Sequence, residues 1–390
     1  MPLACVLGDI DLVRALGLAG IPSAVCAPRG TPERFSRFTR ARLDWTDPWI
    51  DPDRLLDTLC DFGRTQVEPP VLYYEEDGDL LFVARHRERL ATLFRFVVPD
   101  LELALDLVDK ERFQALAQRL QLPVPPGRCL RPEPGSPAPA RDLKYPLVVK
   151  PLTRRPSVWG PVGGAGKAVR VDGAAELERL WAPLAESRQA ILIQELLPGP
   201  ETWIESYHVY VDEAGAVVGE FTGRKLRTYP TQFGHSTALV TTDAADVRAL
   251  GRELIERLGF RGVAKLDFKR AADGRLHLLE VNARFNLWHH LGARAGVNLP
   301  ALVYRDLTGT PRTPVAPGRP GVRWCKLWTD ARAARALGIP FPRWLVWALG
   351  AEAKRAVAWD DPLPLVGAGL RAVWRRLAGR NGVVRADVKR

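Results

Sequence analysis

The stretch "HLLEVNARFNLWHH", residues 277–290, has the pattern that decides the fold of this chain. It begins like a buried strand, yet Glu280, Asn282 and Arg284 interrupt its apolar residues at every second position. Side chains two residues apart in a strand point to the same face, so an acid, an amide and a guanidinium should project together from apparent core. Alone, such a trio is more often a solvated strand face than a site, so the rest of the chain has to decide.

Composition predicts a globular protein of two or three domains, because 46% of its 390 residues are hydrophobic. No apolar run approaches the roughly 18 residues of a transmembrane helix, and the N-terminal "MPLACVLGDIDLVRALG" has no basic region of a secretory signal. The five cysteines are scattered, odd in number and never in CxxC spacing, which argues against disulfides and structural zinc. We therefore expect a reducing, cytoplasmic location.

Charge is distributed unevenly along the chain. Residues 316–390 contain 15 Lys and Arg against 5 Asp and Glu, a net charge of +10 out of +11 for the whole chain. Six of the twelve tryptophans also lie there. Over the whole chain Arg outnumbers Lys by 46 to 10, so the few lysines are weakly informative, because a site that needs a compact ammonium cannot use Arg.

The N-terminal segment, residues 1–105, reads as an α/β domain that opens strand, helix, strand. Its first loop contains only Gly8, and a dinucleotide fingerprint needs several glycines. We therefore expect this domain to contribute to a substrate site and not to bind NAD or FAD. A Pro-rich linker at residues 131–146 precedes the buried strand "LVVKP" and a glycine-rich stretch. Two hairpins are predicted beyond it, at residues 203–226 and 262–284.

Several further polar residues stand in or beside apolar elements: Lys150, Lys167, Glu195, Glu201 and Asp267. Each has an ordinary explanation, because a lysine that ends a strand is usually solvated and a glycine-rich loop is usually a turn. Their combination is more specific. Oxygen ligands from neighbouring strands suit Mg²⁺, and lysines beside a glycine-rich loop suit a polyphosphate. Arg284 could bind an anion next to the metal. Together they indicate a site for a nucleoside triphosphate with magnesium.

Residues 106–310 resemble the ATP-grasp superfamily, whose motif order they follow: "DKERF", "YPLVVKP", "GGAGK", "IQELLPGPE", "GVAKLDF" and "LLEVNAR". The whole chain, notably "FTGRKLRTYP", is most similar to the carboxylate–amine ligase branch, which includes D-aspartate ligases. The resemblance implies an α/β (α+β) ATP-grasp fold. Residues 1–105 would be a Rossmann-like pre-ATP-grasp domain. Within residues 106–310, about 140–200 would carry the lid and 201–310 the metal site. Residues 311–390 would be a basic, Trp-rich extension.

The resemblance also assigns the nucleotide-binding residues. Phosphate contacts would come from Lys150, Gly163, Gly164, Gly166 and Lys167. Adenine would meet Glu195, Leu196 and Leu197, and the ribose would meet Glu201. The glycine loop is longer than usual for the family, since "TRRPSVWGPVGGAGK" occupies residues 153–167.

The metal residues follow from the same resemblance. Asp267 and Glu280 would hold one Mg²⁺, and Glu280 would bridge to a second ion completed by Asn282, with Mn²⁺ as a substitute. Asp267 stands where Glu is commoner in the family. Arg284 would stabilise charge on the transferred phosphoryl group.

Other polar residues are candidates for substrate binding. Lys225 and Arg227 would bind an anionic substrate. His289 and His290 cannot share one helix face, so we expect one to pack and one to be exposed, with a role at the acyl acceptor as the alternative.

These residues imply that ATP phosphorylates a carboxylate and that an amine attacks the acyl phosphate, giving an amide or peptide, ADP and phosphate. One alternative is an ATP-grasp enzyme that activates bicarbonate, although no biotin-acceptor module is present. Another is a non-catalytic nucleotide-binding protein, which the complete set of metal ligands disfavours. The expected partners are an amino-acid-like acid and amine and a second copy of the chain in a homodimer, and no nucleic acid is expected.

The basic extension, residues 311–390, allows three interpretations. Its helices could pack their tryptophans on the body and leave arginines in water. They could also lie peripherally on the inner face of an anionic membrane, or contact another anionic substrate or partner.

Overall fold

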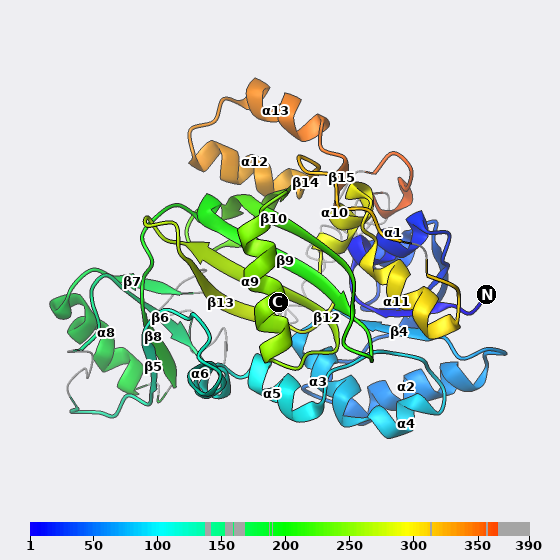
Figure 1. Cartoon of the computed structure of the whole chain (residues 1–390), viewed down its shortest axis with the longest axis horizontal. Coiled ribbons are helices and arrows are strands. Elements are labelled where there is room, and N and C mark those ends of the chain that lie inside the picture. The colour runs from blue at the N-terminus through cyan, green and yellow to red at the C-terminus, as the bar shows by residue number, and fades with distance from the viewer. Residues whose placement is uncertain are drawn as a thin grey trace, which may run out of the picture.

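The fold is taken from a computed structural model, which describes residues 1–136, 142–152, 159, 168–186, 188, 190–312, 314–355 and 358–365. The strands of these residues form three sheets (Figure 1). The small sheet with α8 lies at one end of the molecule, the large sheet lies in the middle, and the N-terminal sheet lies at the other end. All five cysteines are free thiols.

The N-terminal sheet is parallel, as the strand–helix–strand opening predicts. Its strands, in the order β3-β2-β1-β4, are β1 (Ala4–Leu7), β2 (Ser23–Ala27), β3 (Thr39–Asp44) and β4 (Val71–Tyr74). The helical elements beside it are α1 (Ile10–Leu18), η1 (Pro32–Phe35), α2 (Pro52–Arg64), α3 (Asp77–Arg85) and α4 (Arg87–Ala91).

The loop after β1 uses its single glycine for close packing. A Cβ at Gly8 would lie 2.7 Å from Glu75 Oε2, and the same oxygen accepts a 2.6 Å hydrogen bond from the Asp9 N–H. Asp9 then caps α1 by accepting a hydrogen bond from the Asp11 N–H. The glycine therefore makes room for a carboxylate, where a dinucleotide-binding loop would make room for a pyrophosphate.

The small sheet is antiparallel and has a core of its own. Helices α5 (Leu101–Val108) and α6 (Lys110–Arg119) lead to it from the N-terminal sheet. Its strands, in the order β5-β8-β6-β7, are β5 (Gly127–Leu130), β6 (Leu147–Pro151), β7 (Val169–Val171) and β8 (Ile191–Glu195). Helix α8 (Ala174–Glu186) packs on it through Leu177, Trp181 and Leu184.

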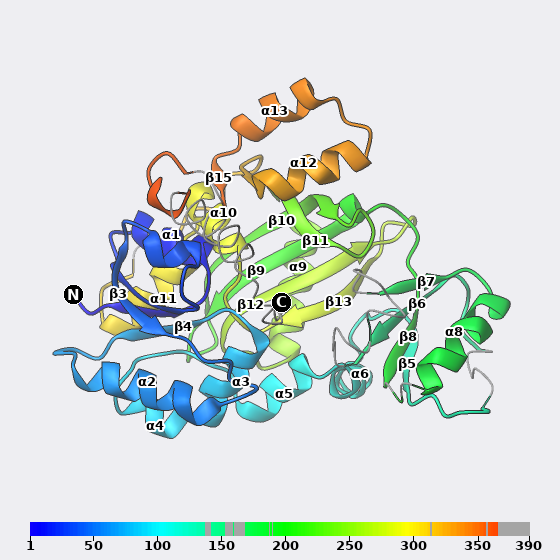
Figure 2. The ribbon, with the colours of Figure 1, turned by 180° about the vertical axis from the view of Figure 1, so that it is seen from behind.

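The large sheet has the order β13-β12-β9-β10-β11-β14-β15 (Figure 2). Its strands are β9 (Ile204–Val211), β10 (Val217–Tyr229), β11 (His235–Thr242), β12 (Gly262–Arg270), β13 (Leu276–Asn282), β14 (Arg323–Cys325) and β15 (Ala353–Lys354). The associated helical elements are η2 (Glu201–Trp203), α9 (Ala245–Arg257), α10 (Trp288–Ala295) and α11 (Leu299–Thr308). Both predicted hairpins are present, as β9–β10 and β12–β13. One hydrophobic cluster joins this sheet to the N-terminal helices.

The β12–β13 hairpin sets the register of the polar trio Glu280, Asn282 and Arg284 that alternates in the sequence. Asp267 pairs with Glu280 and Lys265 with Asn282, and the register then shifts by one residue. The shift lies between Glu280 and Leu278, so Glu280 and Asn282 still alternate on one face, but β13 ends at Asn282 and Arg284 lies beyond the strand. The trio is therefore not a single run of alternating strand residues.

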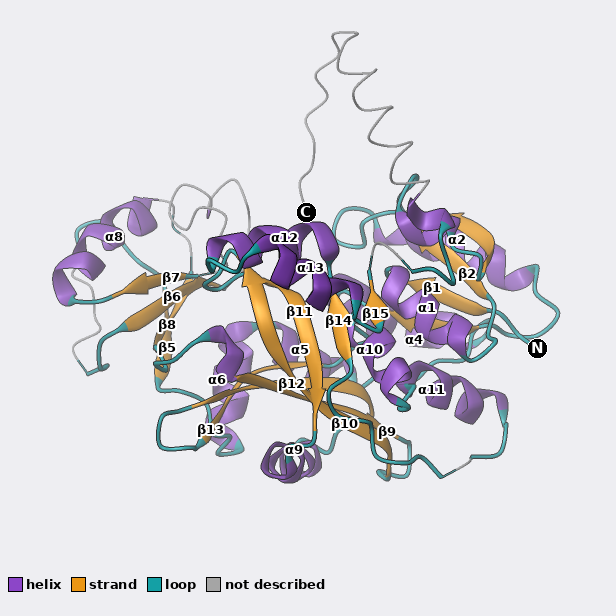
Figure 3. Ribbon diagram, turned by 90° about the horizontal axis from the view of Figure 1, so that it is seen from above, coloured by secondary structure: helices purple, strands orange, loops and turns teal. Residues whose placement is uncertain are grey.

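The C-terminal residues extend the large sheet, which the sequence did not indicate. Strand β14 pairs with β11, and β15 pairs with β14. Between them, α12 (Leu327–Ala336) and α13 (Phe341–Leu349) form a helical hairpin over the sheet (Figure 3). In the described part of the chain, no helix is long and apolar enough to cross a membrane.

Candidate active site

A cavity of about 410 Å³ lies between the small sheet and the large sheet. Strands β6 and β8 form one wall, β10, β12 and β13 form the other, and α6 closes one side. Nine of the residues predicted from the sequence line it: Lys150, Glu195, Leu196, Leu197, Glu201, Lys225, Asp267, Glu280 and Asn282. The structure thus brings together side chains from positions that are up to 132 residues apart.

Asp267 is the buried carboxylate of this cavity. Its Oδ1 accepts a hydrogen bond from the Ser206 hydroxyl, and its Oδ2 accepts one from Lys265 Nζ at 2.7 Å. Lys225 Nζ lies 3.9 Å from the same Oδ2. Burial alone would raise the pKa of Asp267, but the two ammonium groups hold it well below its usual range. The carboxylate is therefore ionised at neutral pH.

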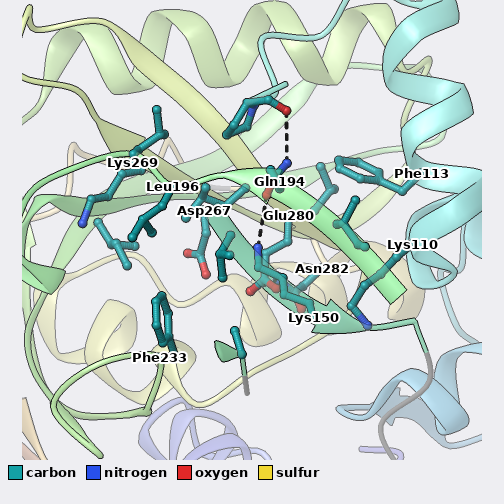
Figure 4. A pocket seen from close by; sticks show the side chains of 18 of the residues that line it. Lys110, Phe113, Lys150, Gln194, Leu196, Phe233, Asp267, Lys269, Glu280 and Asn282 are labelled. Atoms are coloured by element: carbon teal, nitrogen blue, oxygen red, sulfur yellow. Dashed lines mark hydrogen bonds between the residues drawn. The ribbon is translucent and has the colours of Figure 1, made fainter. Parts of the chain in front are cut away.

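Glu280 and Asn282 continue the polar wall on β13 (Figure 4). Glu280 stands directly across the hairpin from Asp267 and is exposed, and its Oε1 accepts a 3.1 Å hydrogen bond from Asn282 Nδ2. Two carboxylates and an amide oxygen are a suitable ligand set for a hard cation such as Mg²⁺. Among the described residues no three His, Cys, Asp or Glu side chains gather as metal ligands, so the amide would have to be the third protein ligand.

Lys150 and Lys225 carry opposite pKa shifts. Burial lowers the pKa of Lys150 to about 8, although Glu280 partly offsets this effect. Its Nζ donates a 3.2 Å hydrogen bond to Gln194 Oε1, and Gln194 is held in turn by the Pro125 carbonyl (Figure 4). Burial also disfavours the charge on Lys225, but the nearby carboxylates, Asp267 first, outweigh burial and raise its pKa.

The end of the cavity at β8 presents backbone groups and apolar side chains. The N–H groups of Glu195 and Leu196 donate to the carbonyls of Pro126 and Pro146, at 2.8 and 2.9 Å. Glu195 Oε1 accepts a 2.9 Å hydrogen bond from the Lys144 N–H, so this side chain braces the loop. Apolar side chains complete the lining here: Val148, Leu192, Ile204, Leu279 and Val281. An aromatic base would fit between such walls.

Five polar residues that line the cavity were not among the site residues predicted from the sequence: Asp77, Lys110, Gln114, Gln194 and Lys269. Lys110 Nζ donates to the Leu152 carbonyl at 2.9 Å, and burial lowers its pKa. Lys269 Nζ donates to the Gly199 and Pro200 carbonyls and so fixes the loop that carries Glu201. The scarcity of lysine was the available signal, since four of the ten lysines line the cavity while no described arginine does.

Arg284 lies beside the cavity but does not line it. Its guanidinium contacts Asp77 Oδ1 at 2.5 Å, the Glu75 carbonyl at 2.7 Å and Asn282 Oδ1 at 3.2 Å. Burial disfavours its charge, yet Asp77 foremost among nearby acids raises its pKa further. Its partners Asp77 and Asn282 both line the cavity, so Arg284 is one side chain away from it. A role for Arg284 at a transferred phosphoryl group stays a prediction.

Arg227 lies away from the cavity, contrary to the position expected of a substrate ligand. It forms a two-pronged ion pair with Asp330, at 2.8 and 2.7 Å, and its guanidinium lies 4.0 Å from the centre of the Trp347 ring. Its hydrogen-bonding fork is therefore occupied by α12. Arg227 does not reach the cavity because the C-terminal α12–α13 hairpin covers this end of β10.

The remaining predicted residues fall into two groups. Gly163, Gly164, Gly166 and Lys167 lie outside the described residues. His289 and His290 are both buried, so the expectation that one is exposed was wrong. Burial lowers the pKa of His289 to about 3, and His290 Nδ1 lies 3.1 Å from Asp11 Oδ1. Neither histidine lines the cavity.

Comparisons with known proteins agree with this geometry. Residues 187–327 match the family described as "ATP-grasp in the biosynthetic pathway with Ter operon". A D-alanine–D-alanine ligase of Alkalilimnicola ehrlichii is 28% identical over 225 residues, which cover 55% of this chain and 68% of the relative. A D-aspartate ligase of Enterococcus faecium is 22% identical over 299 residues, which cover 73% and 70%. The chain is an ATP-grasp protein.

Solved structures support the fold of this ATP-grasp protein independently. The biotin carboxylase domain of Hydrogenobacter thermophilus 2-oxoglutarate carboxylase, solved with MgADP, ADP and bicarbonate, superposes with a TM-score of 0.59 at 15% identity. The match covers 82% of this chain and 72% of that one. The expected fold class is confirmed, and the named relatives place the chain among the carbon–nitrogen ligases of the superfamily, which work with ATP and Mg²⁺.

Proposed function

We propose that this protein is a carboxylate–amine ligase that forms an amide or peptide bond through an acyl phosphate, converting ATP to ADP and phosphate. The observation that carries the proposal is the pairing of Asp267 with Glu280 across one hairpin, with Lys150 and Lys225 facing the same cavity. A carboxylate is a poor electrophile, and an acyl phosphate supplies the leaving group that attack by an amine requires.

The chain's own residues would divide the binding of ATP between two walls. Lys150 would neutralise phosphate charge from the small sheet, and Lys225 would do so from the large sheet. The walls around Leu196 and Leu197 would hold adenine, and Glu201 would accept hydrogen bonds from the ribose. Because the cavity is partly enclosed by both sheets, it would limit access of water to the acyl phosphate.

Asp267, Glu280 and Asn282 would hold magnesium in the proposed enzyme. The metal would supply Lewis acidity and offset charge on the phosphate oxygens. Lys265 and Lys225 keep Asp267 ionised, so this carboxylate would already be in the form that binds magnesium. Two ions, with Mn²⁺ as a substitute, are part of the proposal.

The substrates follow from the relatives by analogy. Since those relatives are named as ligases of D-alanine and of D-aspartate, we infer an amino-acid-like carboxylic acid and an amino-acid-like amine. A homodimer, a cytoplasmic location and peripheral membrane contact through residues 311–390 stay predictions.

A release assay tests the reaction. The protein would be incubated with MgATP and pairs drawn from a panel of D- and L-amino acids and simple organic acids, with ADP, AMP, phosphate and pyrophosphate measured separately. Release of ADP and phosphate that needs both an acid and an amine supports the proposal. AMP with pyrophosphate would instead indicate an adenylate, and release that needs bicarbonate alone would indicate a carboxylating enzyme.

A further inference from the structure

The α12–α13 hairpin has one side fixed to the protein. Asp330 of α12 is buried and accepts hydrogen bonds from Arg227, from the Thr237 hydroxyl at 2.8 Å and from Trp344 Nε1 at 2.9 Å. Trp344 and Ala348 of α13 pack in the same small core. In Figures 1 and 2 the two helices stand out from the body of the molecule above the large sheet.

The outer side of the hairpin is apolar. Trp328 is 69% exposed, Phe341 65%, Val346 74% and Leu349 59%. Along α13, Val346 and Leu349 lie three residues apart and both face solvent, whereas Leu345 packs against the buried cluster and the Phe341 ring lies 5.5 Å from the Trp344 ring. Helix α13 thus buries one apolar face and leaves Val346, Leu349 and most of Phe341 exposed. Large apolar side chains gathered on a surface in this way usually mark a contact with a partner or a membrane.

The same surface is cationic. Arg332, Arg335 and Arg343 are exposed, and none of them has an ion pair or hydrogen bond within the described part of the chain. The single acid between Leu327 and Leu349 is Asp330, which is buried and paired. The sequence that follows, residues 366–390, contains seven more Lys and Arg against one Asp. A partner for this surface must therefore be both apolar and negatively charged.

Two occupants fit this description poorly. A second copy of the chain, related by two-fold symmetry, would bring the three arginines of each hairpin close to those of the other. A nucleic acid would match the charge, and Trp328 and Phe341 could stack on bases, but exposed aliphatic Val346 and Leu349 would gain no stacking contact from it. Aliphatic and aromatic side chains flanked by arginines are the combination found where helices lie in a lipid interface.

We propose that the outer side of the α12–α13 hairpin binds the surface of a membrane rich in anionic phospholipids. Phe341, Val346 and Leu349 would enter the boundary between headgroups and acyl chains, and the three arginines would meet the phosphates. The inference does not depend on the reaction proposed above, because none of these residues lines the cavity.

Vesicle flotation of the full chain tests the proposal. Vesicles of phosphatidylcholine with 40% phosphatidylglycerol (about this fraction suits an anionic leaflet) are compared with pure phosphatidylcholine, at low and high salt. Flotation with the anionic vesicles that weakens with salt is expected. The variant Phe341→Ser/Val346→Ser/Leu349→Ser should lower the partition coefficient more than about tenfold. The variant Arg332→Gln/Arg335→Gln/Arg343→Gln should lower it on the order of 100-fold at low salt, since each basic residue contributes about fivefold.

Matched controls carry the same changes on other surfaces. Ile50→Ser/Val67→Ser removes exposed apolar side chains of the N-terminal region, and Arg40→Gln/Arg85→Gln/Arg179→Gln removes three exposed, unpaired arginines. Both should float like the unaltered chain, and circular dichroism and thermal melting should be unchanged in every variant. The proposal is overturned if the unaltered chain does not float, or if the hairpin variants float as well as it does. It is equally overturned if light scattering shows that the apolar variant turns a dimer into a monomer with no change in flotation.

Discussion

Two buried aspartates face cations from one strand of the large sheet and are held in different ways. Asp267 of β12 lies near Lys225, and Asp330 of α12 pairs with Arg227, two residues further along β10. Asp330 is held by a two-pronged guanidinium, a hydroxyl and an indole N–H. Asp267 is held by ammonium groups and one hydroxyl at the edge of an open cavity.

The two sites differ in how rigidly the cation holds the carboxylate. A guanidinium fork fits a carboxylate in one fixed geometry, whereas an ammonium is a compact point charge on a flexible stem. Arg227 therefore holds Asp330 in one fixed geometry, while Lys225 and Lys265 hold Asp267 through point charges on flexible stems. In a chain with 46 Arg and 10 Lys, lysine at a buried carboxylate indicates a binding site more reliably than the carboxylate itself.

Asp330→Ala should give the largest effect, on stability. It leaves Arg227 buried without its partner, which should lower the free energy of unfolding by about 3–5 kcal/mol. Urea denaturation would measure the change, with Asp246→Ala as a control because that carboxylate is exposed. A decrease in the free energy of unfolding below about 1 kcal/mol, the size of a surface ion pair, would mean that Asp330 does not stabilise the fold and so does not differ from Asp267 in that respect.

Glu280→Gln should come next and should act on turnover. An amide at this position is neutral and of similar reach, so it should bind magnesium poorly and lower turnover about 100- to 1000-fold, by analogy with the loss of one charge-stabilising group. The urea midpoint should stay close to that of the unaltered protein, because Glu280 is exposed. A near-normal rate would mean that Glu280 is only a hairpin acid and that Asp267 is also structural.

The two cavity lysines should respond differently to pH. Lys150, whose pKa is lowered to about 8, keeps its charge below pH 8 and loses it as the pH rises through that value. At pH 9 about one molecule in ten still carries that proton, so MgADP should bind up to about tenfold more weakly than at pH 7. Lys225, whose pKa is raised, should stay charged throughout.

Titration calorimetry at both pH values would measure this dependence. Lys150→Arg should remove most of it, because a guanidinium stays charged at pH 9. Equal affinity of the unaltered protein at pH 7 and pH 9 would show that Lys150 does not meet the phosphates.

Arg227→Lys should give the smallest effect. The ion pair with Asp330 would persist with one prong in place of two, and the stacking on Trp347 would be lost, at a cost of about 1 kcal/mol of stability. Turnover should not change, since Arg227 does not line the cavity. A specific rise in the KM for an acid substrate would indicate that Arg227 binds the anionic substrate, as its sequence position predicts.

The sequence by itself predicted most of the residues that surround the cavity. Motif order placed nine predicted residues around one cavity, because those motifs sit on strands whose pairing is local, such as the β12–β13 hairpin. Alternation along a strand is readable from residue types alone, and so are turn signals such as "ADG". The scarcity of lysine was also readable, and Lys110 and Lys269 carry the same signal as the lysines that were selected as site residues.

Only the tertiary structure decided which cations are free to bind a ligand. Arg227 and Asp330 are 103 residues apart, and nothing near either residue signals their pairing. The same holds for β14 and β15, which are too short to recognise by periodicity and which form only because the edge of β11 is there to pair with. The exposure of Val346 and Leu349 on α13 also depends on how the helix docks, since a helix that is apolar over most of its surface does not specify which side will be buried.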